Sequence, residues 1–285
     1  MRTERRLSAG IMLLPAAVIF AVAFVLPLAG VAWRSITEPE PGLGNYVTLL
    51  FDGVSLTVIL RTGWVALLVT LVTLVLGYPY AYALTLVSPR TRAIMFTLVL
   101  VPFWTSMMAR NFAWLVLLQN GGPLQRLFAA VGREDVVLFG TTAGVVIAMS
   151  QVLLPFMVLP LFSVMQGIDR RLVSAAVSLG SSHTRAFWKV YWPLSRRGIV
   201  SGFLLVFSVS LGFYVTPAII GSPQESLIAQ LLSVRTMEQL DFGGAGALGL
   251  FVLVVTLLLV AGISRFGGST SALGSALSRK DGISA

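Results

Sequence analysis

The sequence predicts an all-α integral membrane protein with six transmembrane helices, and three observations support this fold class. Of the 285 residues, 56% are hydrophobic and only 11% are charged, which leaves too much apolar surface for a water-soluble domain of this length. The chain contains six apolar runs, each long enough to cross a hydrocarbon layer about 30 Å thick. All eleven acidic residues fall outside these runs.

The six expected spans are separated by segments rich in Gly, Pro and charged residues. The first run resembles a secretory signal in its basic flank, but it is 21 residues long and lacks a small-residue cleavage site, so we expect a retained span. Proline within a run is compatible with a transmembrane helix, because neighbouring helices satisfy the carbonyl groups that proline leaves free. In order, the expected spans are Ile11–Val31, Thr62–Val87, Ala93–Leu118, Thr141–Met165, Ile199–Ile220 and Ala245–Ile263.

The connecting segments contain two places where a short helix is expected. Between the first two spans, the loop composition of Arg34–Arg61 is interrupted by the apolar run Tyr46–Phe51, which predicts a small interfacial helix. The segment Gln119–Gly140 is a loop that should hold another short helical piece. Gly221–Gly244 is polar and is expected outside the membrane, and residues 265–285 form a Gly- and Ser-rich tail.

Basic residues are distributed unevenly between the two sides of the expected membrane. If the N-terminus is inside, 14 of the 20 Lys and Arg residues, but only three of the eleven acidic residues, lie on the inner side. Because Lys and Arg concentrate in cytoplasmic loops, we expect both termini in the cytoplasm. The net charge of +9 is thus divided by side and not gathered on one basic face, so nucleic acid is not expected as a partner.

The segment Asp169–Gly198 is too polar to cross a membrane, yet it has a helical pattern. Asp169 is a good N-cap for a short helix, and Gly180 supplies the left-handed residue that closes it. We expect a second helix that ends at Pro193, because proline interrupts the pattern. A helix pair that docks on another protein and an amphipathic helix in contact with membrane lipid both fit this basic segment. Three hydroxyl residues can cap the second helix: Ser181, Ser182 and Thr184.

The pattern of small residues in this segment resembles that of a known protein family. Ser174-Ala175-Ala176, followed by Gly180 and by Val190-Tyr191-Trp192-Pro193, is similar to the EAA loop of permease subunits from binding-protein-dependent ABC importers. In that family the loop forms a short helix that sits in a cleft of the cytoplasmic ATPase and transmits ATP-driven motion to the pore. Two positions differ, since Ser174 stands where the family has Glu and Trp192 where it has Leu. The resemblance therefore implies the docking shape but not an ion pair with the ATPase.

Four further stretches resemble the spermidine/putrescine branch of this family and extend the resemblance over spans two to five. The resemblance implies a single permease domain over residues 1–285, with a core of spans two to six at 62–265 and a cytoplasmic coupling loop at 169–198. It also implies a bacterial inner-membrane location and a polyamine or related nitrogenous compound as the solute. The stretches are GYPYAYAL at 77–84, RNFAWLVLLQ at 110–119, LLPFMVLPLF at 153–162 and GFYVTPAIIG at 212–221.

Such a permease forms half of a pore, so the resemblance also implies partners. These are a second homologous permease, two copies of a cytoplasmic ABC ATPase, an extracytoplasmic solute-binding protein and the small-molecule solute. The sequence has no GxxxxGK[ST] phosphate-binding loop, which predicts that a partner hydrolyses ATP and that this chain is not an enzyme. With no Cys and one His, the sequence predicts no metal site, no catalytic residues and no cofactor.

Two sets of candidate residues follow. The coupling set is implied by the resemblance and comprises Asp169, Ser174, Ala175, Ala176, Gly180, Phe187, Val190 and Pro193. A solute path along spans three and five is expected for two reasons. Residues 212–217 of span five combine Gly, adjacent aromatic residues and Pro, which break the regularity of a helix within a span. Polar groups in span three should face the bundle interior. A packed kink in span five and a snorkelling arginine in span three are the alternatives. The path set comprises Trp104, Arg110, Asn111, Phe213, Tyr214, Thr216 and Pro217.

A secondary transporter for a small polar solute is the alternative function, since broken helices also suit that class. Coupling to protons or sodium usually requires an acidic residue or paired half-helices within the membrane. None of the expected spans contains an acidic residue, which argues against this alternative.

Overall fold

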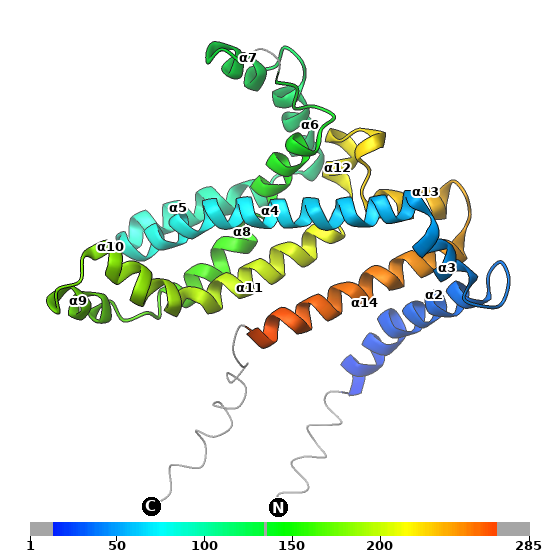
Figure 1. The fold of residues 1–285 in the computed structure, drawn as a ribbon, viewed down its shortest axis with the longest axis horizontal. Helices are drawn as coiled ribbons and strands as arrows, with labels where there is room; N and C mark the ends of the chain where they lie inside the picture. The colour runs from blue at the N-terminus through cyan, green and yellow to red at the C-terminus, as the bar shows by residue number, and fades with distance from the viewer. Residues whose placement is uncertain (1–13, 134–135, 267–285) are drawn as a thin grey trace, which may run out of the picture. The chain divides into compact units, whose positions relative to one another are not determined.

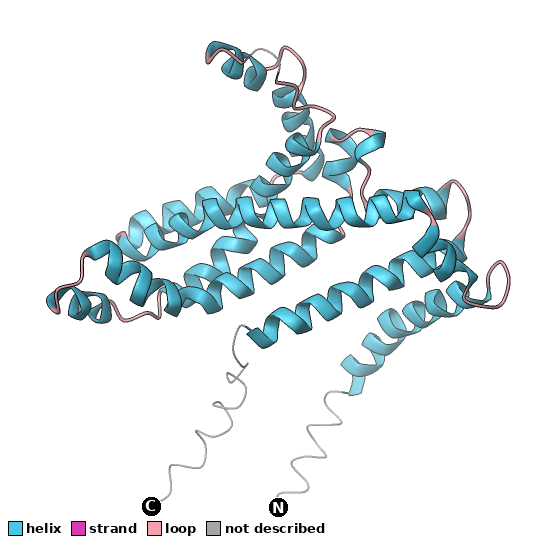
Figure 2. Ribbon diagram, in the orientation of Figure 1, coloured by secondary structure: helices cyan, strands magenta, loops and turns pink. Residues whose placement is uncertain are grey.

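The computed structural model describes residues 14–133 and 136–266, and these residues form only helices and connecting loops (Figure 2). The expected all-α fold class is therefore confirmed. The chain divides into two compact units (Figure 1). The first unit comprises Met1–Ile59 and Gln230–Val255, and the second comprises Leu60–Ala229 and Thr256–Ala285.

Five helices among the described residues are long and apolar enough to cross a membrane, and a bent helix pair makes six if it counts as one span. This agrees with the expected six spans and with a multi-pass membrane protein. The five helices are Leu14–Thr37, Gly53–Leu86, Thr142–Met165, His183–Leu211 and Phe242–Ile263, and the bent pair is Pro89–Trp104 with Met107–Ala130.

The first unit contains α3 (Gly44–Phe51), which confirms the short helix predicted from the apolar run Tyr46–Phe51. The Tyr46 hydroxyl on α3 lies 2.8 Å from the Ser35 hydroxyl on α2 (Leu26–Thr37), and the two form a hydrogen bond. Helix α2 continues the π-helical turn η1 (Ala21–Val25). The unit also includes most of α13 (Ile228–Met237) and of α14 (Phe242–Phe266).

Helix α13 was not predicted, because the segment that contains it is polar overall. Its Arg235 lies 3.5 Å from the carboxylate of Asp52, which directly precedes α4 (Gly53–Leu86). The Ser55 hydroxyl donates a hydrogen bond to the same carboxylate at 2.5 Å, and this bond holds the pKa of Asp52 below its usual value. These contacts attach the start of α4 to α13 within the first unit.

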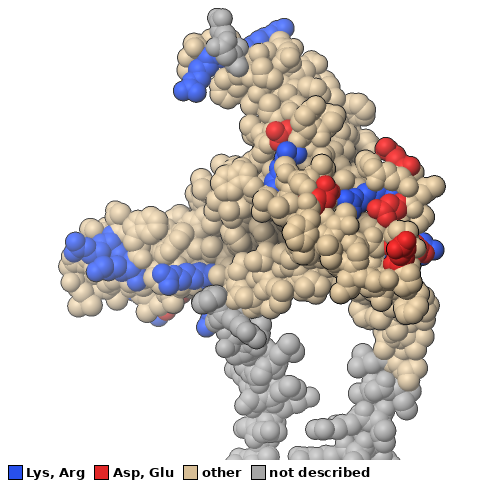
Figure 3. Space-filling model, turned by 45° about the vertical axis from the view of Figure 1, so that its right-hand side comes forward, with Lys and Arg blue, Asp and Glu red and all other residues tan. Residues whose placement is uncertain are grey.

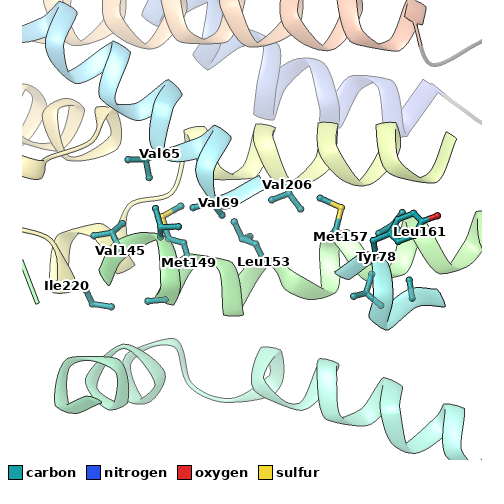
Figure 4. Packing of buried hydrophobic residues seen from close by; sticks show 14 of the residues in the cluster. Val65, Val69, Tyr78, Val145, Met149, Leu153, Met157, Leu161, Val206 and Ile220 are labelled. Carbon is teal, nitrogen blue, oxygen red and sulfur yellow. The ribbon is translucent and has the colours of Figure 1, made fainter. Parts of the chain in front are cut away.

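The second unit is packed around α8 (Thr142–Met165), which confirms span four. Helix α11 (Trp192–Leu211) lies along α8, and glycines allow this close approach. A Cβ atom on Gly202 would lie only 2.6 Å from the Met157 Sδ atom, and one on Gly198 would lie 3.2 Å from the Leu161 Cα atom. The buried side chains of this core (Figure 4) include Val69, Met149, Leu153, Met157 and Val206.

The shorter helices of the second unit connect these long ones. Helix α7 confirms the short helical piece predicted in the loop after span three. The remaining elements are α5 (Pro89–Trp104), α6 (Met107–Leu118), α7 (Pro123–Ala130), α9 (Arg171–Ser178), α10 (His183–Ala186), the π-helical turn η2 (Phe187–Tyr191), α12 (Val215–Ile220) and the 3₁₀ turn η3 (Pro223–Glu225).

Span three, predicted as Ala93–Leu118, is not one straight helix in the structure. The segments Pro89–Trp104 and Met107–Ala130 meet at a bend of 96°. Pro102 lies in the last turn of α5, where it removes a backbone donor. Its carbonyl accepts hydrogen bonds from Thr105 Oγ1 at 2.7 Å and from Arg110 Nη1 at 2.8 Å. Side chains therefore satisfy a backbone group that the break leaves free.

Span five also differs from the predicted Ile199–Ile220. The apolar helix runs continuously from His183 to Leu211, so Pro193 does not end the preceding helix as expected. Pro193 lies in the first turn of α11, directly after the π-helical turn η2. In an α-helix the proline ring would clash with the carbonyl four residues earlier, and the wider π-helical turn displaces that carbonyl. The helix then stops before α12.

Several other helix ends differ from the predicted ones. The first helix continues past Val31 to Thr37, and α4 begins well before Thr62. Helix α14 begins a few residues before Ala245. The start of the first predicted span, residues 11–13, and most of the predicted tail lie outside the described residues.

Candidate coupling surface and solute path

Helix α9 lies between Asp169 and Gly180, the two residues that the sequence predicts near its ends. The Asp169 carboxylate accepts a hydrogen bond from the Arg171 amide at 2.9 Å, although Asp169 lies one residue before the helix cap itself. Gly180 has a φ of +91° and its amide donates to the Val177 carbonyl at 2.9 Å. Nothing lies within 4 Å of the position of a Cβ atom on Gly180. Glycine is therefore required here for its left-handed backbone and not for space.

Helix α9 exposes its small residues. Ser174 and Ala175 are exposed, and Ala176 is half-buried. The Ser174 hydroxyl makes only a long contact, 3.5 Å, to a backbone carbonyl of the preceding turn. Leu172 is 49% exposed and Leu179 is 89% exposed. Exposed small and apolar side chains on a short helix provide a surface on which another protein can pack.

The second helix of the pair begins with α10. Its cap is Ser182, one of the three expected hydroxyl residues, whose Oγ accepts a hydrogen bond from the Arg185 amide at 3.3 Å. Helix α10 continues through η2 into α11 without interruption. Phe187 and Val190 are half-buried in η2, whereas Pro193 is exposed. The lone histidine, His183, is exposed at the start of α10.

Basic side chains gather at the end of the second unit that carries α9 and α10 (Figure 3). All of those within 169–198 are exposed, and Asp169 is the only acidic residue of that segment. This surface attracts an acidic protein surface or anionic lipid headgroups. The basic residues are Arg170, Arg171, Arg185, Lys189, Arg196 and Arg197.

Two polar contacts attach this helix pair to α4. The Arg170 Nη2 atom donates to the backbone carbonyl of Thr85 and also to its hydroxyl, at 2.9 Å in the latter case. Nearer the middle of α4, the Tyr78 and Ser195 hydroxyls are 3.0 Å apart and share a hydrogen bond. Aromatic rings pack next to these contacts, namely Tyr78, Tyr82, Phe187, Trp188, Tyr191 and Trp192. Local sequence patterns do not predict these contacts, which join residues far apart in the chain.

Helix α12 brings the expected path segments of spans three and five together, because it packs against both α6 and α8. The Gly140 amide, just before α8, donates to the Ile220 carbonyl at the end of α12 at 2.9 Å. The side chains of the path set nevertheless differ in exposure. Asn111, Thr216 and Pro217 are buried, Arg110 and Phe213 are half-buried, and Trp104 and Tyr214 are exposed.

The residues of the path set differ in the contacts that they make. The Asn111 amide donates to the Met107 carbonyl at 2.8 Å within its own helix, so Asn111 contributes to packing. Arg110 supports the bend after α5 through its bond to Pro102. Trp104 is 84% exposed and Tyr214 is 44% exposed. These two aromatic residues are thus the exposed members of the path set.

A polar cluster at the first turn of α8 was missed by sequence reasoning. The Thr142 hydroxyl donates a hydrogen bond to the Glu225 carboxylate, and Arg61 Nε lies 4.0 Å from the same carboxylate. Arg61 also donates to the Ser226 carbonyl at 3.4 Å. The cluster attaches η3 to α4 and α8. Its residues lie on three separate segments, so no local pattern could have indicated it.

Within residues 14–133 and 136–266, no group of three or more His, Cys, Asp or Glu side chains is arranged to hold a metal ion. Among the described residues, Tyr78 bonds to Ser195 and Arg170 to Thr85, whereas the buried Thr216 hydroxyl has no hydrogen-bond partner.

A family model described as "Binding-protein-dependent transport system inner membrane component" matches residues 92–266. The spermidine/putrescine transport system permease protein PotB of Escherichia coli strain K12 is 33% identical over 222 residues, which cover 76% of this chain and 80% of that protein. PotB of Haemophilus influenzae is 30% identical over 220 residues, covering 76% of this chain and 77% of that protein.

The same fold occurs in a solved bacterial alginate ABC transporter, determined in complex with an alginate pentasaccharide-bound periplasmic protein. The TM-score is 0.69 at 17% sequence identity, and the match covers 92% of this chain and 94% of that one. This likeness concerns the fold alone.

Proposed function

The chain belongs to the family of binding-protein-dependent transport system inner membrane components, and from this premise we propose that it forms half of a solute pore and couples that pore to a cytoplasmic ATPase. The observation that carries the coupling role is the exposed helix α9 with its left-handed Gly180 corner. A short exposed helix is suited to receive a partner. The contacts of Arg170 and Ser195 with α4 connect it to a long apolar helix.

The proposed orientation places α9, α10 and both termini in the cytoplasm. The six exposed basic residues of the coupling segment support it, because Lys and Arg concentrate on that side. The absence of cysteine from the sequence allows a direct test with single-cysteine variants. In intact cells, a membrane-impermeant maleimide should label Leu127→Cys on α7 but not Ser174→Cys on α9. Labelling of Ser174→Cys from outside would reverse the orientation.

The proposed assembly contains a second homologous permease, two copies of an ABC ATPase and an extracytoplasmic solute-binding protein. The exposed Trp104 and Tyr214 support the second permease, since a path beside them needs another wall. The lack of a phosphate-binding GxxxxGK[ST] loop supports ATP hydrolysis in the partner, so the chain itself is proposed not to be an enzyme. The solved alginate transporter was determined with a periplasmic protein, which supports the third partner.

The proposed solute is a polyamine such as spermidine or putrescine, and the PotB relatives support it. Phe213 and Tyr214 offer aromatic faces to a cationic solute, each contact contributing roughly 0.5 to 2 kcal/mol. The sequence places no carboxylate in the expected spans, so the second permease would supply the acidic groups that a polycation needs.

A related nitrogenous solute that also carries a carboxylate is the second candidate. Arg110 favours it, because this half-buried guanidinium lies on α6 next to α12 and pairs with no carboxylate among the described residues. Arg110 could meet the carboxylate of an amino-acid derivative. The variant Arg110→Gln distinguishes the two solute classes. It should leave polyamine uptake unchanged but should reduce uptake of a carboxylated solute.

Co-expression with a candidate ABC ATPase and solute-binding protein tests the proposed function. The chain should copurify in detergent with an ATPase, and the reconstituted complex should hydrolyse ATP faster when the solute-loaded binding protein is added. The binding protein should bind spermidine or putrescine in preference to amino-acid derivatives. Solute uptake by the chain alone, driven by an ion gradient, would instead indicate a secondary transporter.

A further inference from the structure

Three residues of α4 lie on one face and contact the coupling segment. Tyr78, Tyr82 and Thr85 are separated by four and three positions, which is the spacing of neighbours along one side of an α-helix. Thr85 accepts the hydrogen bonds of Arg170, just before α9. Tyr78 shares its hydrogen bond with Ser195, just after η2. One face of α4 therefore holds the coupling segment at both of its ends.

The π-helical turn η2 lies between these two attachments. A π-helical turn is rare and replaces the usual hydrogen bonds of the helix by wider ones, and such turns occur frequently at functional sites. In η2 the rings of Phe187 and Tyr191 stack with centroids 5.6 Å apart. The Tyr82 ring packs edge-on against both, at 5.6 and 5.1 Å. The turn is thus held against α4 by ring contacts.

Ser195 connects the turn to the straight part of α11. It is fully buried, and its hydroxyl donates to the Trp192 carbonyl at 2.9 Å in addition to its bond with Tyr78. Tyr78 is 9% exposed and packs its ring 4.9 Å from that of Trp192. The Tyr78–Ser195 hydrogen bond is therefore a buried polar link between two apolar helices, at the point where the π-helical turn changes into α11.

We propose that Tyr78 and Ser195 are positioning residues for coupling, and that their hydrogen bond carries movement of α9 past the π-helical turn η2 to α4. This inference rests on the proposed coupling to an ATPase. Without the bond, α4 would keep its attachment to Arg170 but would lose its polar link to α11, and movement that passes along the coupling segment would be absorbed by the π-helical turn. With the bond, α11 and α4 would move together, so each ATP hydrolysed would move the wall of the pore.

The test measures solute imported per ATP hydrolysed by the complete reconstituted complex. Tyr78→Phe should lower this ratio about five-fold, the size of effect expected for the loss of one hydrogen bond, and Ser195→Ala at least as much, because it also removes the bond to Trp192. The double variant should be no worse than Ser195→Ala, because that variant already removes the bond between the two residues. Copurification of the ATPase and ATP hydrolysis itself should remain as in the wild type.

Tyr82→Phe is the matched control, because Tyr82 lies one turn further along α4 and its hydroxyl makes no hydrogen bond among the described residues. Its ratio should equal that of the wild type. Equal ratios in Tyr78→Phe and Tyr82→Phe, or a double variant whose loss is the product of the two single losses, would overturn the inference. Failure of the wild type to bind an ATPase would overturn the proposed function itself, which keeps the two failures distinguishable.

Discussion

Helix α8 and the pair α5–α6 both contain proline within an apolar stretch, but only the pair is broken. Helix α8 contains Pro155 and Pro160 and runs without interruption, whereas Pro102 in α5 is followed by the 96° bend. The two regions differ in burial. Thirteen residues of α8 are buried and none of α5 is, so packing accompanies the straight helix and exposure accompanies the broken one.

The difference teaches that packing, more than proline content, decides where a span bends. A proline removes one backbone hydrogen bond wherever it lies, but helices that pack on several sides of α8 hold it straight. Helix α5 packs against α8 but has no fully buried residue, and Thr105 and Arg110 satisfy the carbonyl of Pro102. The region that bends is the one whose polar groups were expected along the solute path.

The largest expected effect concerns the packing that keeps α8 straight. Gly202→Leu should lower the free energy of unfolding by about 3 kcal/mol, because its side chain would overlap Met157. Gly63→Leu on α4 is the control, since nothing lies within 4 Å of its Cβ position. Unfolding in detergent, followed by circular dichroism, measures both variants. Equal losses in the two variants would show that the α8–α11 contact has no special role.

An intermediate effect is expected at the bend. Arg110→Met removes the bond to the Pro102 carbonyl and should cost about 1 kcal/mol, a value reduced for the partial exposure of the side chain. Spin labels on Ile94→Cys and Val116→Cys, both exposed, should then report a broader distance distribution across the bend. Arg126→Met on α7 should leave stability and distances unchanged. A distribution as narrow as that of the wild type would show that Arg110 does not hold the bend.

The smallest expected loss of stability concerns the residues that precede the first turns of α8 and α6. Thr141 caps α8, because its hydroxyl accepts a hydrogen bond from the Gly144 amide at 3.3 Å. Ser106 occupies the same position before α6 but makes no such bond. Thr141→Ala should therefore cost about 1 kcal/mol and Ser106→Ala only a few tenths. Thermal unfolding of both variants in the same detergent checks this order, and a larger loss in Ser106→Ala would contradict it.

The features that the sequence predicted correctly depend on local interactions. The Gly180 corner and the Ser182 cap follow from residues within a few positions of one another. The long apolar helices follow from composition, and α3 follows from one short apolar run. Their boundaries were less accurate where a helix continued beyond the membrane-length run, as at both ends of the loop that contains α3.

The features that the sequence did not predict depend on other helices. The proline at 193 was expected to end a helix, but the rings of α4 support a π-helical turn that accommodates it. The bend after Pro102 follows a helix that has no fully buried residue, a property that no window of the sequence reports. The Arg61–Glu225 and Tyr78–Ser195 contacts join segments that are far apart in the chain. Of the expected solute path, the meeting of α6 and α12 is present in the structure, and the passage of solute there remains a prediction.

The most direct test of the coupling role is the variant Gly180→Val in the complete reconstituted complex. Gly180 has a φ of +91° in open space, so valine strains the backbone without creating a clash and should displace α9 from α10. Gly167→Val is the control, because Gly167 precedes α9 but has no left-handed backbone. We expect Gly180→Val to lower both solute uptake and binding-protein-stimulated ATP hydrolysis about ten-fold or more, and Gly167→Val to lower neither. Wild-type uptake and stimulation in Gly180→Val would contradict the account.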